Sequence, residues 1–408
     1  MTENQAIDYI LSLPKLTYPL GNGQLKELLK ILGNPEKALK FIHIAGTNGK
    51  GSAAAMLGSI LTEAGYKTGV FTSPYIISFN ERIRIGKENI SGEQLVYFTA
   101  LVSDTMKEHK IKLSQFAFIL AVAFLYYKEE NCDAVVLEVG LGGRLDATNI
   151  IEESLVSVIM SISLDHTELL GNTVAEIAKE KCGIIKPNGN VVAYRNTHEA
   201  MAVIESCCKE QNASLLVAKE SFSTPKGFKC ENHEYTLSLK GDYQAGNAAT
   251  VLEVVDVLRS KGFEISEAAL KSGFENCVHR ARFERIRENI IVDGAHNEGG
   301  AKALATALSG IDKRKTAVIA MMEDKAVDDV LAILKSCFEK VIVTELDMPR
   351  CMSAKKLCEK ASALGLNTEI EACPEKAFAI AEKSEFSVIC GSIYLTGKAL
   401  KYWEEKDE

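Results

Sequence analysis

The sequence predicts an α/β fold, with an N-terminal domain of the P-loop ATPase type built on a parallel sheet and a smaller C-terminal Rossmann-like α/β domain. Three observations support this prediction. Short apolar runs alternate with segments of helical spacing, which is typical of parallel sheets. A glycine-rich turn separates the first apolar run from a helix. A second series of apolar runs and helices starts near residue 284.

The first series occupies the N-terminal half of the chain. Apolar runs predict strands at 41–45, 67–72, 133–139, 155–162, 191–194 and 215–217. Helical spacing predicts helices at 53–64, 95–108 and 115–129. The polar segment 221–241 has the short pattern of a hairpin, and residues 243–258 are helical again.

The second series predicts strands at 290–292, 316–320, 341–343 and 387–389, with helices between them. At roughly 100 to 200 residues per domain, the 408 residues correspond to two or three domains, and two are expected. The boundary falls within 274–285, where no Pro/Gly linker marks it. We therefore expect one domain over residues 1–280 and a second over residues 281–408.

The composition excludes several classes of protein. Lys and Arg minus Asp and Glu give 47 − 55 = −8, so a general nucleic-acid binder is disfavoured. The eleven cysteines include no CxxC pair, which favours reduced thiols over a zinc site or a disulfide framework. The N-terminus lacks a signal-peptide pattern, and no apolar run reaches the ~18 residues of a membrane span. A cytoplasmic protein without nucleic-acid or membrane partners is expected.

Residues 46–52, with the sequence GTNGKGS, predict a phosphate-binding loop. Glycines let backbone N–H groups turn inward, the following helix adds its positive end, and Lys50 adds a full charge. The hydroxyl comes one position later than in the strict P-loop pattern, at Ser52. A glycine-rich surface turn is the alternative, and the strand–turn–helix context favours phosphate.

Two polar side chains follow predicted strands. Glu138 ends an apolar run and precedes a glycine-rich stretch, where a carboxylate facing a phosphate loop would suit Mg²⁺. His166 lies just past the strand at 155–162. Each has an ordinary alternative, because Glu138 could cap a neighbour and a lone His is more often structural than a ligand.

Lys181, Arg282 and the segment from Asp293 to Asn297 each have a plain structural interpretation from sequence alone. Lys181 reads as a solvated helical lysine, and Arg282 as an ordinary arginine in a linker. Asp293 and His296 follow the strand at 290–292 where a helix opens near Asn297, so Asp293 or Asn297 could simply cap that helix.

Taken together, these motifs resemble the folylpolyglutamate synthase and dihydrofolate synthase family, within the Mur ligase superfamily. The resemblance spans nearly the whole chain and occurs in order at 31–35, 43–52, 71–74, 79–83, 138–149, 164–167, 181–186, 243–248, 282–284 and 293–297. Each motif alone is weak, but their number and order make chance resemblance negligible.

The resemblance implies an ATP-dependent amide ligase. A folate or dihydropteroate carboxylate takes the γ-phosphoryl group of ATP, and the amine of L-glutamate displaces phosphate from the resulting acyl phosphate. The acceptor is dihydropteroate, a folate or both. The resemblance also implies two Mg²⁺ sites, a monomer, and a C-terminal domain that closes over ATP and glutamate. Because two anions must approach each other, the site must offset their repulsion.

The resemblance assigns roles residue by residue. It implies ATP contacts at Thr47, Asn48, Gly49, Lys50, Gly51, Ser52, Asn247, Arg282 and Asp293. It implies Mg²⁺ ligands at Ser52, Ser73, Glu138, His166 and Lys181. The lysine matching Lys181 is carried as a carbamate, whose negative charge suits a metal where an ammonium would not. Lys50, Lys181 and His296 are the expected catalytic residues, with His296 close to the reacting phosphate.

Three positions depart from the family pattern. Tyr75 stands where His is usual, Ala281 where Gly is usual, and Ala326 where the second Asp of Asp-Lys-Asp is usual. The first puts the pterin pocket in doubt, and the other two put fine nucleotide or glutamate contacts in doubt. None removes a phosphate or metal group.

Three other functions remain as alternatives. A cell-wall Mur ligase is disfavoured by the folate-like residues 33–35 and by the lack of an added N-terminal UDP-binding domain. A P-loop ATPase that couples hydrolysis to a protein partner would leave Glu138, His166, Lys181 and Asp293 without a joint purpose. A bare binding module would leave the phosphate loop unexplained.

Overall fold

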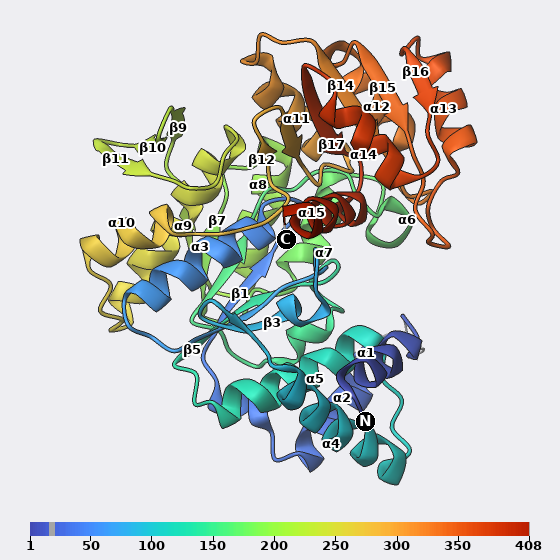
Figure 1. The fold of residues 1–408 in the computed structure, drawn as a ribbon. Coiled ribbons are helices and arrows are strands. Elements are labelled where there is room, and N and C mark those ends of the chain that lie inside the picture. The colour runs from blue at the N-terminus through green and yellow to red at the C-terminus, as the bar shows by residue number, and fades with distance from the viewer. Residues whose placement is uncertain (16–20, 408) are drawn as a thin grey trace.

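The computed structural model describes residues 1–15 and 21–407. Two α/β units lie one above the other, with the second, coloured orange to red, against one edge of the first (Figure 1). Within the described ranges, no helix is long and apolar enough to cross a membrane. The division at residue 280 stays a prediction.

The first unit is built on an eight-stranded sheet of order β4-β3-β2-β5-β1-β6-β7-β8. Its strands are β1 (Phe41–Ala45), β2 (Thr68–Phe71), β3 (Ile83–Ile85), β4 (Glu88–Asn89), β5 (Ala134–Glu138), β6 (Val156–Ile159), β7 (Asn190–Ala193) and β8 (Ser214–Val217). All pair in parallel except β3 and β4, which are antiparallel. The sheet is therefore mixed and not purely parallel as predicted. The strands β3 and β4 are too short to leave a pattern in the sequence.

Side chains alternate across β1, so its residues pack into hydrophobic cores on both faces of the sheet. Ile42 and Ile44 pack under α3 (Lys50–Glu63), α9 (Tyr243–Ser260) and α10 (Glu267–Glu275). Phe41 faces a core formed with α1 (Glu3–Ser12), α2 (Gly23–Ile31), α4 (Gly92–His109) and α5 (Gln115–Glu129). Ala45, on that second face, meets α7 (Val174–Cys182) and α8 (His198–Glu210). The sheet is thus covered on both sides.

Shorter elements complete the first unit. They are the helical turns η1 (Pro35–Ala38), η2 (Phe79–Arg82), η3 (Ala147–Ile150) and α6 (Thr167–Leu170). The expected hairpin is a three-stranded antiparallel sheet of β9 (Ser221–Thr224), β10 (Gly227–Cys230) and β11 (His233–Thr236).

The second unit has a six-stranded sheet of order β12-β13-β17-β14-β15-β16, in which only β12 is antiparallel. Its strands are β12 (Glu284–Arg287), β13 (Ile290–Val292), β14 (Lys315–Ile319), β15 (Lys340–Val343), β16 (Thr368–Ile370) and β17 (Phe386–Cys390). One face packs on α11 (Glu298–Ser309), α12 (Val327–Leu334) and α13 (Ala354–Ala363), and the turn η4 (Lys335–Cys337) follows α12. The other face packs on α14 (Pro374–Glu382) and α15 (Ile393–Asp407).

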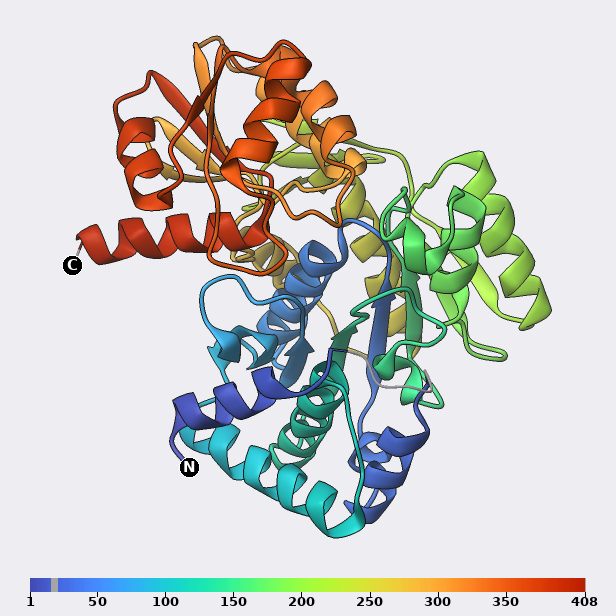
Figure 2. The same cartoon turned by 90° about the vertical axis from the view of Figure 1, so that its right-hand side faces the viewer.

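The two units touch through α15, which extends beneath the second sheet in Figure 2. Ile76 and Ile77 of the first unit pack against the α15 core. The contact is so close that a methyl group on Gly397 of α15 would overlap the carbonyl of Ile76. A glycine is therefore required at this point of the interface.

Candidate active site

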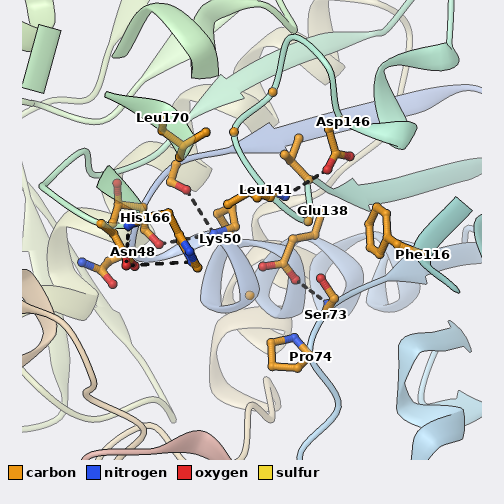
Figure 3. Close-up of a pocket in the computed structure, with 18 of the residues that line it drawn as sticks. Asn48, Lys50, Ser73, Pro74, Phe116, Glu138, Leu141, Asp146, His166 and Leu170 are labelled. Atoms are coloured by element: carbon orange, nitrogen blue, oxygen red, sulfur yellow. Dashed lines mark hydrogen bonds and ion pairs between the residues drawn. The ribbon is translucent and has the colours of Figure 1, made fainter. Parts of the chain in front are cut away.

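A cavity of about 1170 Å³ lies between the two units. It receives the carboxyl ends of β1, β2, β5 and β6 from the first sheet and the loops after β13, β14 and β17 from the second. Every site residue expected from the sequence lines this cavity: Thr47, Asn48, Gly49, Lys50, Gly51, Ser52, Ser73, Glu138, His166, Lys181, Asn247, Arg282, Asp293 and His296. Figure 3 shows Glu138 between Lys50 and Ser73, with His166 near Asn48.

The phosphate loop joins β1 to α3, and its shape depends on glycine. Gly46 and Gly49 have φ angles of 155° and 86°, which favour glycine. A methyl group on Gly49 would lie 2.5 Å from Asn247 Oδ1. Thr47 N and Asn48 N donate to the Ser161 carbonyl at the end of β6, and Lys50 Nζ donates to the Gly46 carbonyl at 3.0 Å. The loop is thus held open at the start of α3.

Glu138 places a buried carboxylate opposite this loop. Its Oε2 accepts a hydrogen bond from Ser73 N at 3.1 Å. Burial raises the pKa of Glu138, while the charges of Lys50, Arg282 and Arg82 oppose the rise. The pKa of Glu138 therefore lies above its ordinary value, and the nearby cations limit the rise.

Lys181 is buried and not solvated, so the plain interpretation from sequence is wrong. Its side chain is 4% exposed, and Nζ donates to the Gly46 carbonyl at 2.9 Å. Burial first, and then the neighbouring Lys50, lower the pKa of Lys181 to about 7. The amine is therefore substantially neutral at physiological pH.

The segment holding Lys181 is fixed by backbone packing. A methyl group on Gly143 would lie 2.7 Å from the carbonyl oxygens of both Glu180 and Lys181. One on Gly183 would overlap the backbone of Arg144. Two glycines thus let the loop after β5 lie directly on the end of α7.

Asp165 links the two units beside the phosphate loop. It accepts hydrogen bonds from Lys325 Nζ at 2.8 Å and from Asn297 Nδ2 at 2.9 Å, both in the second unit. Burial opposes ionisation of Asp165, but Lys325 and His166 outweigh it and hold the pKa of this carboxyl well below its usual range. Asn297 also bonds Asn48 of the phosphate loop at 3.2 Å.

His166 lies beside this link and not beside Glu138. Its Nε2 is 3.2 Å from Lys325 Nζ, and burial and Lys325 lower its pKa. The residue has a left-handed backbone, with φ 50°, at the start of α6. A histidine held in this conformation is uncommon and is typical of functional loops.

The second unit contributes Asp293 and His296 from the loop after β13. Asp293 accepts from Phe283 N and Ala295 N, both at 2.8 Å, so it pins its own loop to the Arg282 segment. Neither N–H belongs to α11, so the helix cap that its plain interpretation expected is not made by Asp293. Asn297 caps α11 by accepting from Gly300 N. His296 Nδ1 contacts the Gly294 carbonyl at 2.9 Å, and burial lowers its pKa to about 4. His296 is therefore neutral, with its proton on Nδ1 and Nε2 an acceptor.

Arg282 lines the cavity beside Asp293 and is more than a linker residue. Its charge opposes the rise that burial causes in the pKa of Asp293. Ala281, the neighbouring departure from the family pattern, is buried with φ 58°, a conformation that favours glycine. Its carbonyl accepts from Gly294 N, so it ties the Arg282 segment to the Asp293 loop.

Asn247 reaches the phosphate loop through a buried chain of amides. Its Nδ2 donates to Gln244 Oε1 at 2.9 Å, and Gln244 Nε2 donates to Ser52 Oγ at 3.2 Å. Both residues lie in the first turns of α9. The helix thus orients the hydroxyl that follows the P-loop lysine.

The far end of the cavity is apolar and was not assigned from sequence. Phe116, Leu141 and Asp146 line it, away from the phosphate loop in Figure 3. Asp146 Oδ1 accepts from Thr148 Oγ1 at 2.6 Å, and Thr148 Oγ1 lies 2.8 Å from His43 Nε2. A buried histidine therefore supports the carboxylate. The glycine-rich stretch at 138–149 is the sequence feature that could have indicated this end of the cavity.

Two family models match the chain. Residues 44–255 match the Mur ligase middle domain, and residues 281–393 match the Mur ligase glutamate ligase domain. The dihydrofolate synthase/folylpolyglutamate synthase of Bacillus subtilis is 37% identical over 92% of this chain and 93% of its own length. The Escherichia coli enzyme of that name is 31% identical over 97% and 94%.

The chain belongs to the dihydrofolate synthase/folylpolyglutamate synthase family.

Solved structures of this family have the same fold. The Mycobacterium tuberculosis folylpolyglutamate synthase complexed with ADP has a TM-score of 0.89 at 28% identity, covering 98% of this chain and 97% of that one. An Escherichia coli family member in complex with DHPP and ADP has a TM-score of 0.86 at 29% identity, covering 100% and 99%. The chain is an acid–amino-acid ligase that uses ATP to add glutamate to folates or dihydropteroate.

Proposed function

We propose that ligation takes place in two steps within the cavity shared by residues 1–280 and residues 281–408. First, an oxygen of the acceptor carboxylate attacks the γ-phosphorus of ATP, giving an acyl phosphate and ADP. Second, the amine of glutamate attacks the acyl carbon, the amide bond forms, the amine loses its proton and inorganic phosphate leaves. One observation carries this proposal: all the expected site residues, from both units, line one cavity.

ATP lies with its phosphates along the loop from Thr47 to Ser52. Backbone N–H groups at the start of α3 and the Lys50 ammonium face these phosphates. Among the described residues, Lys50 Nζ bonds only carbonyl oxygens of its own loop, at 3.0 and 3.3 Å, so it can turn to a phosphate without breaking a hydrogen bond to another element. Asn247, Arg282 and Asp293 contact the rest of the nucleotide.

The residues around Glu138 fit Mg²⁺. Its Oε1 accepts no hydrogen bond within the described ranges, and the hydroxyls of Ser52 and Ser73 line the same cavity, which gives the oxygen donor set that Mg²⁺ prefers. Glu138 and the hydroxyls of Ser52 and Ser73 are the groups that would hold the ion. Bound Mg²⁺ supplies charge that offsets the repulsion between phosphate and carboxylate.

Lys181 carries a carbamate in the working enzyme. Only a neutral amine attacks CO₂, and the burial of Lys181 beside Lys50 provides one. The new N–C bond costs the amine a proton and leaves a carboxylate-like anion at the Gly46 side of the cavity. This anion and His166 would hold the second Mg²⁺.

The neutral His296 places an acceptor atom, Nε2, near the reacting phosphate. We assign the apolar end of the cavity to the ring system of the acceptor, which packs against Phe116 near Asp146. The second unit closes over ATP and glutamate through Asp165 and Asn297, and this excludes water from the acyl phosphate. The enzyme works as a monomer.

The test is a side-by-side assay of dihydropteroate and tetrahydrofolate, with ADP release measured and the products resolved by mass. ADP release is expected only when an acceptor and L-glutamate are both present, with a product heavier by one glutamyl residue. ATP turnover without glutamate would contradict the ligase mechanism. Turnover without any acceptor, stimulated by a protein, would support the ATPase alternative. Size-exclusion chromatography with light scattering tests the monomer.

A further inference from the structure

One cation in the cavity has no assigned task. Arg82 ends the turn η2, and its side chain lines the cavity next to Ser73 and Pro74. Within the described residues its guanidinium has no acidic partner and donates no hydrogen bond, and its Nε is buried without a partner. Arg82 is partly buried, so its guanidinium is only partly solvated and a bound anion would stabilise it.

The other cations of the cavity form ion pairs, donate hydrogen bonds, lie beside a carboxylate or are exposed to solvent. Arg144, Lys325 and Arg350 pair with Glu180, Asp165 and Asp324. Lys50 and Lys181 donate to the Gly46 carbonyl, and Arg282 lies beside Asp293. Two more lysines, at 15 and 112, are exposed at the rim. Among the described residues, Arg82 and Arg282 are therefore the lining arginines whose side chains form no hydrogen bond or ion pair, and Arg282 has Asp293 beside it.

Two aromatic rings hold Arg82 without neutralising it. Its Cζ lies 5.3 Å from the ring centre of Tyr75 and 5.6 Å from that of Phe79. Aromatic faces attract a guanidinium and fix its plane, but they leave its N–H edge free for a ligand. Tyr75, one of the departures from the family pattern, therefore has a positioning role here.

The backbone around Arg82 is rigid. Glu81 accepts hydrogen bonds from the N–H groups of Ile76, Ile77 and Ser78 at 2.8 to 3.1 Å. Thr72 N donates to the Arg82 carbonyl at 3.1 Å, which ties it to the end of β2. The guanidinium is thus held in place before any ligand arrives, which is what recognition of a planar anion requires.

The surroundings of Arg82 indicate which anion it meets. Arg82 acts electrostatically on Glu138, at the phosphate end of the cavity. Tyr394 of α15, in the second unit, lines the same cavity. The attacking amino acid must lie between these two places, because its amine meets the acyl phosphate beside Glu138.

We propose that Arg82 binds a carboxylate of the incoming L-glutamate and so positions its amine for attack. The proposal rests on the proposed function of the cavity. Glutamate brings two carboxylates into a buried site, and each needs a cation or donors there. The planar N–H edge of Arg82 matches a carboxylate in two parallel hydrogen bonds. The acceptor's reacting carboxyl is the other source of this chemistry, but it loses its charge when it is phosphorylated.

The experiment compares Arg82→Gln and Arg82→Lys with the wild-type enzyme. Arg314→Gln, at an exposed arginine outside the cavity, is the control. Arg82→Gln is expected to raise the KM for L-glutamate roughly 10- to 100-fold, as loss of a charge-assisted pair does, with Arg82→Lys intermediate. The KM for ATP, and the Kd of the acceptor measured with a non-hydrolysable ATP analogue, should change less than about twofold.

Glutamate analogues give a readout that loss of structure does not mimic. Glutamine lacks the γ-carboxylate and isoglutamine lacks the α-carboxylate. The wild-type enzyme should prefer glutamate to both, and Arg82→Gln should lose the preference against one of them. Unchanged preference in both Arg82 variants would overturn the proposal. A weaker acceptor Kd with an unchanged glutamate KM would assign Arg82 to the acceptor and overturn it too. Failure of the proposed function is distinct, because the wild type itself would then show no glutamate-dependent ADP release.

Discussion

Lys50 and Lys181 donate to the same acceptor, the carbonyl oxygen of Gly46, at 3.0 and 2.9 Å. Lys50 lies at the start of α3, and Lys181 lies in the last turn of α7. Burial and mutual repulsion lower the pKa of Lys181 to about 7, and burial also lowers that of Lys50. The repulsion would be relieved if one of the two amines became an anion, as carbamylation of Lys181 would make it.

Replacing Lys181 by Ala is expected to lower kcat at least about 100-fold, because a charged group that acts on the reacting phosphates is lost. Short carboxylates such as acetate should restore part of the activity by taking the place of the carbamate. Lys179→Ala, at an exposed lysine of the same helix, is the control. The measurement is glutamate-dependent ADP release, and ¹³C NMR with labelled bicarbonate reports the carbamate directly. An unmodified amine in a metal-loaded crystal grown with bicarbonate would rule out the modification.

Gly143→Ala is expected to displace the end of α7. Its methyl group would lie 2.7 Å from two backbone carbonyl oxygens, which cannot move as a flexible side chain could. We expect a loss of about 1 to 3 kcal/mol in the free energy of unfolding and a lower kcat, because Lys181 shifts with the helix. Gly310→Ala, where a methyl group meets open space, is the control in urea unfolding. Equal stability of the two variants would refute the close packing.

Lys325→Met removes the cation that pairs with Asp165 across the two units. Lys325 is 8% exposed and Asp165 is 11% exposed, so the carboxylate is left poorly solvated. Urea unfolding should show a loss of about 2 kcal/mol, and the pKa of Asp165 should rise toward its ordinary value. The stability that this pair contributes is present above the unfolded pKa of Asp and is lost as the pH falls, so the variant should be less acid-sensitive than the wild type. Parallel pH profiles would contradict this.

His43 gives a second pH effect. Burial first, and then Lys186, lower the pKa of His43 to about 3, whereas it is 6.5 in the unfolded chain. Between these values the unfolded chain binds one more proton, so the free energy of unfolding falls by up to about 1.4 kcal/mol per unit as the pH drops below 6.5. His43→Gln keeps a donor for Thr148 and removes this contribution. Its unfolding free energy, measured from pH 7 to pH 4, should fall less steeply than that of the wild type.

Much of the fold could be predicted because buried strands and strong helices leave local patterns. The strands at 41–45 and 290–292 and the helix at 115–129 have the predicted bounds. The antiparallel strands β3, β4 and β12 were missed, since they have only two to four residues, mostly half-buried or exposed, and carry no apolar run.

Motifs and family resemblance identified the candidate site residues, but they did not predict the burial of these residues or the charges beside them. Lys181 has the local sequence of a solvated lysine, and its burial depends on Gly143, which lies in another loop. Arg282 reads as a linker residue because its neighbour Asp293 is distant in sequence. Arg82 lies in the family motif at 79–83. That its guanidinium has no acidic partner among the described residues is visible only in the folded structure.

The contact between Gly397 and Ile76 joins α15 to the short segment that begins at Ser73 and ends at Arg82. This segment holds Ser73, proposed as a magnesium ligand, and Arg82, proposed to bind the amino acid. Because Gly397 lies directly against Ile76, a displacement of α15 would be transmitted through the backbone of this segment to both residues.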